Sequence, residues 1–375
     1  MKNNIIVQVG PYPQPIGGVS IYIKRMRLYM DLVGLANEVW DLSNINKNIG
    51  GVTNIRLRYV PFKYLFRKNI KLIHYNIPGI SYKIYIGFFN RLLFKRRKKI
   101  LTIHGASKDL FTHKGLLVCK YLLNNKNLPI NYDIIMAKSL NSFDAIICVK
   151  PGDKKYLFTK GINKPIYEVP AFIFPIENEE SLTIPKYIVD FINSKNFIIC
   201  ANASLIQFYD NQDLYGIDMC IDLIEKLNAN RKNVGLVFCL PYINNTLYFN
   251  KLKNIIKSKK IESNFLFVNE KMELYPIIKK SQLFVRPTNT DGDAVSIREA
   301  LFYKIPTVAS DICTRPQGTI LFKSRNIDDL YNKTVDVIEN YEKAKEKLKD
   351  IKVEDNARKL LKIYEECLKQ LIIYD

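Results

Sequence analysis

The stretch Arg286–Asp311, RPTNTDGDAVSIREALFYKIPTVASD, joins one expected strand to the next through a polar loop and a helix. The apolar residues Leu283–Val285 before the loop predict a buried strand, and Thr307–Ala309 predicts the second strand. Between them, Ser296–Tyr303 has the apolar spacing of a helix. Because strands that are connected through a helix are usually parallel, the stretch predicts an α/β fold.

The same alternation of strand and helix occurs along the whole chain. Further short apolar runs predict strands at Ile5–Val9, Ile100–Ile103, Ala145–Val149, Ile166–Val169, Phe197–Ala201, Val234–Leu240 and Asn264–Val268. Further helical patterns span Val19–Asp31, Gly216–Asn228 and Leu247–Lys257. Because both halves of the chain show this alternation, we expect two Rossmann-like, doubly wound domains that face a central cleft.

The segment between residues 170 and 196 marks the expected domain boundary, because it contains three prolines, an acidic patch and little periodicity. We therefore predict an N-terminal domain over residues 1–172, a linker over 173–195 and a C-terminal domain over 196–353. Amphipathic spacing predicts a final helix over residues 354–375, which is a candidate to cross back to the N-terminal domain.

Positive charge is concentrated in the first half of the chain. The formal net charge is +21, yet residues 1–190 hold 29 Lys and Arg against 12 Asp and Glu, whereas residues 191–375 hold 28 against 24. Between Leu42 and Lys108 there are 15 basic residues and no acidic residue. This asymmetry predicts a basic surface for an anionic partner: nucleic acid, phospholipid or a substrate with a diphosphate group.

The cysteines and histidines argue against a disulfide framework and against a structural metal. The seven cysteines are scattered, form no CxxC pair and lie mostly in apolar runs, so we expect reduced, buried thiols in a cytoplasmic protein. The three histidines lack the spacing of a zinc site. No run of about 18 apolar residues predicts a transmembrane helix, and Ile5–Val9 is too short for a signal-peptide core.

The loop after Arg286 places carboxylates beside a helix N-terminus. Asp291 on the loop can accept hydrogen bonds from sugar hydroxyls, and Glu299, one turn into the helix, can bind a ribose diol. The small residues after Gly292 allow backbone N–H groups to approach a phosphate at the start of the helix. An ordinary helix that is capped by Asp293, with Asp291 in solvent, explains the same residues without a ligand.

Asp291, Glu299 eight positions later, the following Ala-Leu and the strand PTVAS resemble the donor-site motif of family-4 retaining glycosyltransferases of the GT-B fold. That motif begins with Glu, so Asp291 provides the same negative charge on a shorter side chain. Two further stretches are similar to the same family: GPYPQPIGGVSIYIKRM (Gly10–Met26) and LTIHG (Leu101–Gly105). Alone, a Gly-Gly turn or a structural histidine explains each of these two. The resemblance rests on all three stretches in the family's order.

The resemblance implies a site for a nucleoside-diphosphate sugar as co-substrate, and transfer that retains configuration without a cofactor or metal. Asp291 would hold the transferred sugar, Glu299 the ribose, and His104 would contact the sugar from the N-terminal domain. The donor phosphates would lie near Gly17, Gly18, Asp293, Ala294, Val295 and Ser296. In this family the departing phosphate is described as helping to deprotonate the acceptor, so no separate general base is expected.

The chain departs from the family pattern where the second domain begins. Family members carry an Arg and a Lys there that neutralise the diphosphate, in a G-R-L…K-G segment. The segment Ala201–Asp218, ANASLIQFYDNQDLYGID, has Ala203 or Ser204 at the Arg position and Tyr215 at the Lys position. Because the departing diphosphate needs its charge stabilised, we expect other cations to substitute. The candidates are Arg286, Arg315 and, less favoured because it lies beside Glu299 on a helix, Arg298.

The stretch Tyr82–Ile100, YKIYIGFFNRLLFKRRKKI, is first apolar and then strongly basic. It predicts a helix with an apolar face at positions 85, 88, 89, 92 and 93, beside Arg91 and the basic run 95–99, that lies on an anionic membrane surface. A solvated basic face over a packed helix is the alternative. The absence of an RNA- or DNA-binding motif argues against nucleic acid as the partner.

Together, these features predict a GT-B hexosyltransferase of surface-polysaccharide biosynthesis that uses a UDP-sugar in preference to a GDP-sugar. Its expected acceptor is a growing glycan on a polyprenyl diphosphate lipid, and its expected location is the inner face of the cell membrane. Two alternatives stay open. One is a non-catalytic GT-B scaffold that binds an anionic glycan, a membrane or nucleic acid, and the other is a sugar phosphorylase.

Overall fold

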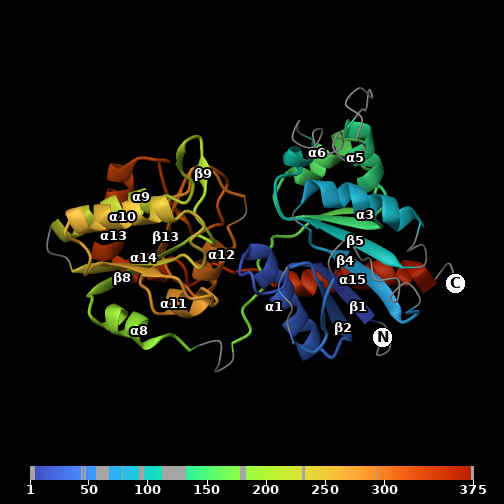
Figure 1. The fold of residues 1–375 in the computed structure, drawn as a ribbon, viewed down its shortest axis with the longest axis horizontal. Coiled ribbons are helices and arrows are strands. Elements are labelled where there is room, and N and C mark those ends of the chain that lie inside the picture. The colour runs from blue at the N-terminus through green and yellow to red at the C-terminus, as the bar shows by residue number, and fades with distance from the viewer. Residues whose placement is uncertain are drawn as a thin grey trace. The chain divides into compact units, whose positions relative to one another are not determined.

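The computed structural model describes residues 5–43, 45, 48–55, 67–77, 79–92, 97–111, 132–177, 183–229, 233–292 and 294–372. The chain divides into two compact units, each built around one parallel sheet (Figure 1). Unit 1 contains residues 1–176 and 355–375, and unit 2 contains residues 177–354. The prediction of two doubly wound, Rossmann-like α/β domains is confirmed.

The described strands of unit 1 form one sheet in the order β3-β2-β1-β4-β5-β6-β7, and all neighbouring pairs are parallel. The strands are β1 (Ile5–Gly10), β2 (Asn37–Asp41), β3 (Val52–Asn54), β4 (Ile70–Tyr75), β5 (Lys98–Ile103), β6 (Ala145–Cys148) and β7 (Ile166–Glu168). The helices are α1 (Gly18–Leu32), α3 (Ile80–Leu92), α5 (Tyr132–Leu140), α6 (Asp153–Thr159), α15 (Asn356–Ile372) and the 3-10 helix η1 (Ser107–Phe111).

Unit 2 has a parallel sheet in the order β12-β11-β8-β13-β14-β15. Its strands are β8 (Phe197–Asn202), β11 (Val234–Cys239), β12 (Phe265–Val268), β13 (Leu283–Arg286), β14 (Thr307–Ser310) and β15 (Ile320–Phe322), and β9 (Phe208–Tyr209) pairs antiparallel with β10 (Gln212–Asp213). The helices are α8 (Lys186–Asn193), α9 (Ile217–Ala229), α10 (Thr246–Ser258), α11 (Tyr275–Lys279), α12 (Val295–Phe302), α13 (Ile327–Glu339) and α14 (Tyr341–Glu346).

Helices cover both faces of the sheet in unit 2. Ile199 of β8 enters an apolar cluster with residues of α9, α10 and α13, whereas its neighbour Cys200 enters a second cluster with residues of α8, α11 and α12. Successive side chains of a strand point to opposite faces, so each face of β8 is buried under its own set of helices. This explains why the strand is a continuous apolar run in the sequence.

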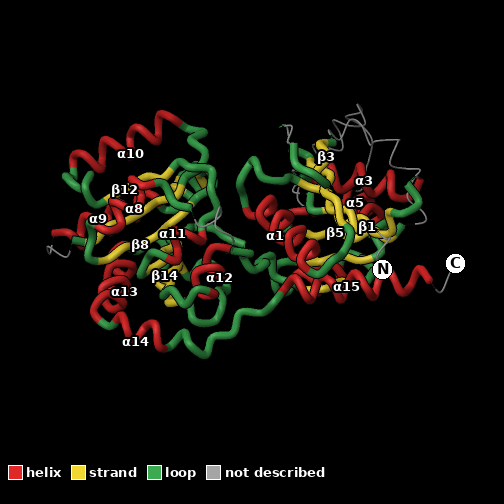
Figure 2. The backbone as a smooth tube through the Cα atoms, turned by 90° about the horizontal axis from the view of Figure 1, so that it is seen from below, coloured by secondary structure: helices red, strands yellow, loops and turns green. Residues whose placement is uncertain are grey.

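The final helix, α15, belongs to unit 1 (Figure 2). It contacts β4 and β5, and the hydroxyl of Tyr364 lies 2.6 Å from Nδ1 of the buried His74. At the start of the helix, Asn356 Nδ2 donates to the carbonyl oxygen of Phe172 over 2.8 Å. Unit 1 is therefore assembled from two segments that are far apart in the sequence.

The stretch Tyr82–Ile100 is not one helix. Helix α3 ends at Leu92, residues 93–96 lie outside the described part of the chain, and Lys98 already begins β5. At the start of β5, Lys98 and Lys99 both lie 3.8 Å from the carboxylate of Asp144, which balances part of their charge. Arg97 is buried and donates to the carbonyl oxygen of Arg67. These three cations are thus part of the packed unit.

None of the helices in the described ranges is long and apolar enough to span a bilayer. The described cysteines carry free thiols, and all of them except Cys313 are buried. Cys119 lies outside the described residues.

Candidate functional site

The strand order of unit 2 reverses between β8 and β13, and Arg286 at the end of β13 bridges that point. Its Nη1 donates to the carbonyl oxygen of Asn202, the last residue of β8, over 3.0 Å, and lies 3.3 Å from Asn202 Oδ1. The guanidinium also lies 5.0 Å from the centre of the Tyr215 ring. In open α/β sheets, ligands bind at the carboxyl ends of the strands where the order reverses.

Asp291 binds the two arginines that the sequence favoured as substitutes, Arg286 and Arg315. Its Oδ2 accepts from Arg315 Nη1 over 2.8 Å, from Arg286 Nε over 3.2 Å and from the Thr288 hydroxyl over 3.3 Å. Arg315 is fixed further by donating to the hydroxyls of Thr288 and Ser310 and to the carbonyl oxygen of Ser310. We call Arg286, Asp291 and Arg315 the ion cluster.

The ion cluster is a buried group with a surplus of positive charge. Its two guanidinium groups face one carboxylate, and the side-chain exposures of Arg315 and Asp291 are only 2% and 11%. Burial alone would raise the pKa of Asp291, but the charge of Arg286 and the hydrogen bond and charge of Arg315 outweigh it and lower the pKa below its ordinary value. A buried cation in excess of its partner favours an anionic ligand nearby.

The turn at Tyr215 is pressed against the loop that carries the ion cluster. Gly216 has a φ of +67°, and a β-carbon there would overlap the carbonyl oxygen of Pro287, the residue after Arg286. Only glycine meets both conditions without strain. Asn289 makes two hydrogen bonds to the segment around β9 and β10. Its backbone N–H donates to the carbonyl oxygen of Leu214, and its Nδ2 donates to the carbonyl oxygen of Tyr209. These contacts hold the Tyr215 ring beside Arg286.

Helix α12 lies in the sequence between two members of the ion cluster, Asp291 and Arg315. Its N-cap residue is Ala294, which supplies no side-chain cap, and Asp293 lies outside the described residues. Ser296 and Glu299 are both buried on this helix, whereas Val295 is partly exposed. Backbone N–H groups in the first turn of a helix have no partner within the helix, so Ala294–Ser296 presents donors to a group at the end of β13.

The remaining predicted site residues lie in unit 1, at the carboxyl ends of its strands. Gly17 is the N-cap of α1, where Ser20 Oγ accepts from its N–H over 2.9 Å, and β-carbons at Gly17 and Gly18 would meet open space. His104 follows β5, with Nε2 2.9 Å from Asn76 Oδ1 and its ring edge-on to Tyr22. Burial, and then the charge of Lys83, lower the pKa of His104 to about 3.

His74 of β4 is fully buried in unit 1. Its Nε2 lies 2.6 Å from the hydroxyl of Thr102, and its Nδ1 faces Tyr364 of α15. Burial lowers its pKa to about 3, with a further contribution from His104. His74 therefore joins the sheet to the final helix and is not accessible to a ligand.

The structure adds residues that the sequence did not suggest. Asn202, Thr288 and Ser310 hold the arginines, and each lies at or just beyond the end of a strand. A rule that inspects every polar residue at a predicted strand end would have found them. Asn76 also follows a strand, but β4 was not predicted, so no such rule could have reached it.

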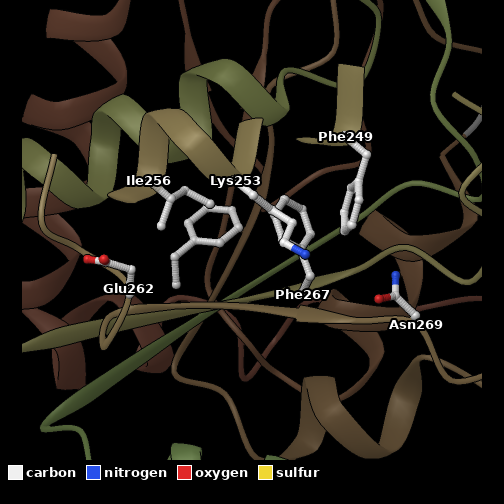
Figure 3. A pocket seen from close by; sticks show the side chains of 7 residues that line it. Phe249, Lys253, Ile256, Glu262, Phe267 and Asn269 are labelled. Carbon is white, nitrogen blue, oxygen red and sulfur yellow. The ribbon is translucent and has the colours of Figure 1, made fainter. Parts of the chain in front are cut away.

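A pocket of about 330 Å³ lies elsewhere in unit 2, against α10 and the edge strand β12 (Figure 3). Its lining residues are Phe249, Lys253, Ile256, Glu262, Phe265, Phe267 and Asn269. None of the residues predicted for the donor site lines it. The pocket is therefore separate from the ion cluster.

Comparisons with known proteins find similarity to one family over part of the chain. Residues 211–354 match the family described as glycosyl transferases group 1, and no curated protein matches the chain. The matched segment contains the ion cluster, the Tyr215 turn and α12. The matched segment lies within unit 2, so this unit is similar to the glycosyl transferases group 1 family.

Solved structures share the whole fold at low sequence identity. A glycosyltransferase from Rickettsia africae ESF-5 has a TM-score of 0.67 at 14% identity, covering 98% of this chain and 100% of its own. Anabaena Alr3699/HepE in complex with UDP and glucose has a TM-score of 0.61 at 12% identity, covering 99% of both chains. The lipopolysaccharide outer core galactosyltransferase WaaB has a TM-score of 0.58 at 13% identity, covering 96% and 99%. The predicted GT-B fold is confirmed.

Proposed function

We propose that the protein is a retaining glycosyltransferase that takes a sugar from a nucleoside-diphosphate donor. The observation that carries this proposal is the ion cluster, which places a buried surplus of positive charge at the point where the strand order of unit 2 reverses. The same segment matches a glycosyltransferase family. Departure of a nucleoside diphosphate requires stabilisation of its growing negative charge, and Arg286 and Arg315 supply it.

Arg286 substitutes for the cations that the family places at the start of its second domain. The residues at those positions are Ala203 or Ser204 and Tyr215, none of which is charged. The guanidinium of Arg286 contacts Asn202, just before the first position, and faces the ring of Tyr215 at the second. A cation from β13 thus reaches the place from which the two family cations are missing.

We assign the ribose, the diphosphate and the sugar hydroxyl to the other predicted residues of unit 2. Glu299 binds the ribose diol, and the N–H groups of Ala294–Ser296 bind the diphosphate. Because Asp291 Oδ2 accepts from both arginines, we assign the sugar hydroxyl to Oδ1, which accepts from the N–H of Gly292 over 3.0 Å. Transfer uses no metal, and UDP is favoured over GDP because a structure of the same fold holds UDP and glucose.

Binding of one nucleotide should depend on Glu299. In a thermal-shift panel of UDP, GDP and their common sugars, we expect one nucleotide to stabilise the wild type by several degrees, and the Glu299→Ala variant to lose that stabilisation. Glu262→Ala is the matched control, because Glu262 is an exposed residue of the same unit beside the separate pocket. Glu299→Gln keeps the size of the buried side chain if the alanine variant is unstable.

Stabilisation by no nucleotide would contradict the proposal and favour a non-catalytic GT-B scaffold. Nucleotide binding without transfer or hydrolysis of the sugar would support that scaffold as well. Release of a sugar phosphate would indicate a phosphorylase. Tight RNA or DNA binding with a steep salt dependence would point to a nucleic-acid partner.

For the acceptor, we propose a growing glycan on a polyprenyl diphosphate lipid at the cytoplasmic membrane face, reached through α3. This helix exposes an aromatic stripe, Tyr82, Tyr85 and Phe88, and Phe88 is 62% exposed. Its opposite face buries the polar side chains of Lys83 and Asn90. An ordinary surface helix does the reverse, with its apolar side chains buried and its polar ones exposed. The helix lies in the part of the sequence that has no acidic residue, so no carboxylate of this segment repels anionic lipid head groups. The aromatic side chains favour the membrane interface.

Removal of the aromatic stripe should release the protein from membranes. With vesicles that contain phosphatidylglycerol, we expect the Tyr82→Ser, Tyr85→Ser, Phe88→Ser variant to bind about tenfold or more weakly than the wild type in cosedimentation. Leu247→Ser removes an 87% exposed apolar residue of unit 2 and should have no effect. Equal binding by the wild type and the triple variant would exclude α3 as the docking surface.

A further inference from the structure

Three neighbouring strands of unit 1 bring Gly10, Asn76 and His104 to one edge of the sheet. β1 ends at Gly10, Asn76 follows β4, and His104 follows β5. A β-carbon at Gly10 would lie 2.6 Å from the carbonyl oxygen of Asn76, so glycine leaves the room that Asn76 occupies. The strand order of this unit reverses between β1 and β4, the position at which α/β sheets bind ligands.

Asn76 is a costly residue for the stability of unit 1. It is fully buried, and its Nδ2 has no hydrogen-bond partner among the residues that the structure describes, whereas its Oδ1 faces His104 Nε2. A buried polar group without a partner carries a cost in folding stability. A leucine of nearly the same size would avoid that cost. Stability therefore does not explain an asparagine at this position, and its contact with His104 is the feature that remains.

The contact with Asn76 determines the form of the His104 ring. An amide oxygen only accepts hydrogen bonds, so the facing Nε2 carries the hydrogen. The groups around the ring are Tyr22 of α1, Lys83 of α3 and His74 of β4. Lys83 donates to the carbonyl oxygens of Ile77 and Gly79 over 2.7 and 3.3 Å, and its positive charge disfavours a second proton on His104.

We infer that Asn76 is a positioning residue that fixes His104 as the neutral, Nε2-protonated imidazole and makes Nδ1 an acceptor for a ligand hydroxyl. This inference rests on the proposed function together with the family resemblance, which implies that His104 contacts the transferred sugar, and it adds the class of group that contacts the ring. A sugar hydroxyl can donate to Nδ1. A carboxylate or phosphate oxygen offers only lone pairs at neutral pH and is excluded.

The ring of His104 can be observed directly, without substrate. The chain has three histidines, so long-range ¹H–¹⁵N NMR of protein with labelled histidine resolves each ring, and His104→Gln assigns the signals. We expect the Nε2–H tautomer and no titration between about pH 5 and pH 8. In Asn76→Asp the new carboxylate favours the imidazolium, so the pKa of His104 should rise by about 2 pH units.

Asn90→Asp is the matched control for the NMR experiment. Asn90 is also buried in unit 1, but its Oδ1 accepts from the hydroxyl of Tyr75 and does not face His104. We expect His104 in this variant to keep the wild-type tautomer and pKa. A wild-type His104 with its hydrogen on Nδ1, or one that titrates near about pH 6.5, would overturn the inference whether or not the proposed transfer occurs.

Asn76→Leu separates positioning from stability. We expect its melting temperature to equal or exceed that of the wild type, because the unpaired amide is gone, while kcat/KM for the donor falls about tenfold or more. Asn76→Asp should retain activity at high pH and lose it as the pH falls through the raised pKa of His104. Full activity in Asn76→Leu would remove Asn76 from the site, even if the NMR result agrees.

Discussion

Replacement of Arg286 by alanine should lower donor turnover by about 100- to 1,000-fold, the usual cost of removing one charge-stabilising donor from an active site. The guanidinium contacts Asn202, the Tyr215 ring and Asp291, and the alanine variant loses all three contacts. The measurement is release of nucleoside diphosphate from the donor that the thermal-shift panel selects. Arg286→Lys should recover little, because lysine has no planar fork for two acceptors.

Arg298→Ala is the control for this experiment. Arg298 lies on α12 next to Glu299, is only partly exposed and is not a member of the ion cluster. We expect it to keep donor turnover within about twofold of the wild type. Because Arg286 is buried, circular dichroism must first show that the alanine variant is folded. A folded Arg286→Ala protein with wild-type turnover would refute the role that we propose for this residue.

Asp291→Asn should destabilise unit 2 by about 3–5 kcal/mol, because it leaves two buried guanidinium groups without their counter-ion. Since the folded-state pKa of Asp291 is lowered, its charge stabilises the fold above its ordinary pKa, and this contribution is lost as the pH falls through the lowered value. The difference between variant and wild type should therefore be constant above about pH 5 and shrink below about pH 4. Urea unfolding followed by circular dichroism measures it.

The fluorescence of the single tryptophan allows the unfolding of unit 1 to be followed separately. Trp40 lies on β2 of unit 1, so its fluorescence reports unfolding of the unit that does not contain Asp291. Asp336→Asn, an exposed change on α13, should leave both signals unchanged.

The double variant Asp291→Asn, Arg315→Met should lose less free energy of unfolding than the sum of the losses in the two single variants, because one charge is removed from each side of the ion pair. Strict additivity would show that the ion pair contributes nothing.

Strands dominated by apolar residues could be predicted from the sequence, whereas β4, which polar residues interrupt, could not. β8 and β11 are buried on both faces and are apolar except for Asn202 at the end of β8. β4 was missed because Lys71 and His74 interrupt its sequence, IKLIHY. The structure shows that His74 is buried in spite of its polarity, since Thr102 and Tyr364 satisfy its two nitrogens. Such pairing is a tertiary property that no local pattern reveals.

The same distinction between local patterns and tertiary contacts applies to the residues of the candidate site. The loop and helix that carry Asp291 and Glu299 could be identified, because their spacing is local. The bond from Asp291 to Arg315 joins residues that are 24 positions apart, and the contact of Arg286 with Asn202 joins residues 84 apart. These distances are set by the sheet, so the sequence could suggest the arginines as candidates but could not show that one carboxylate holds both.

The return of α15 to unit 1 has a consequence for the order of synthesis. On a ribosome the chain emerges from its N-terminus, so β4 and β5 are made long before Tyr364 exists to cover His74. Unit 2 is continuous in sequence and can be completed while the first sheet still lacks its last helix. The half of the protein that is made first is therefore finished last, and loss of a short C-terminal segment would damage the N-terminal half.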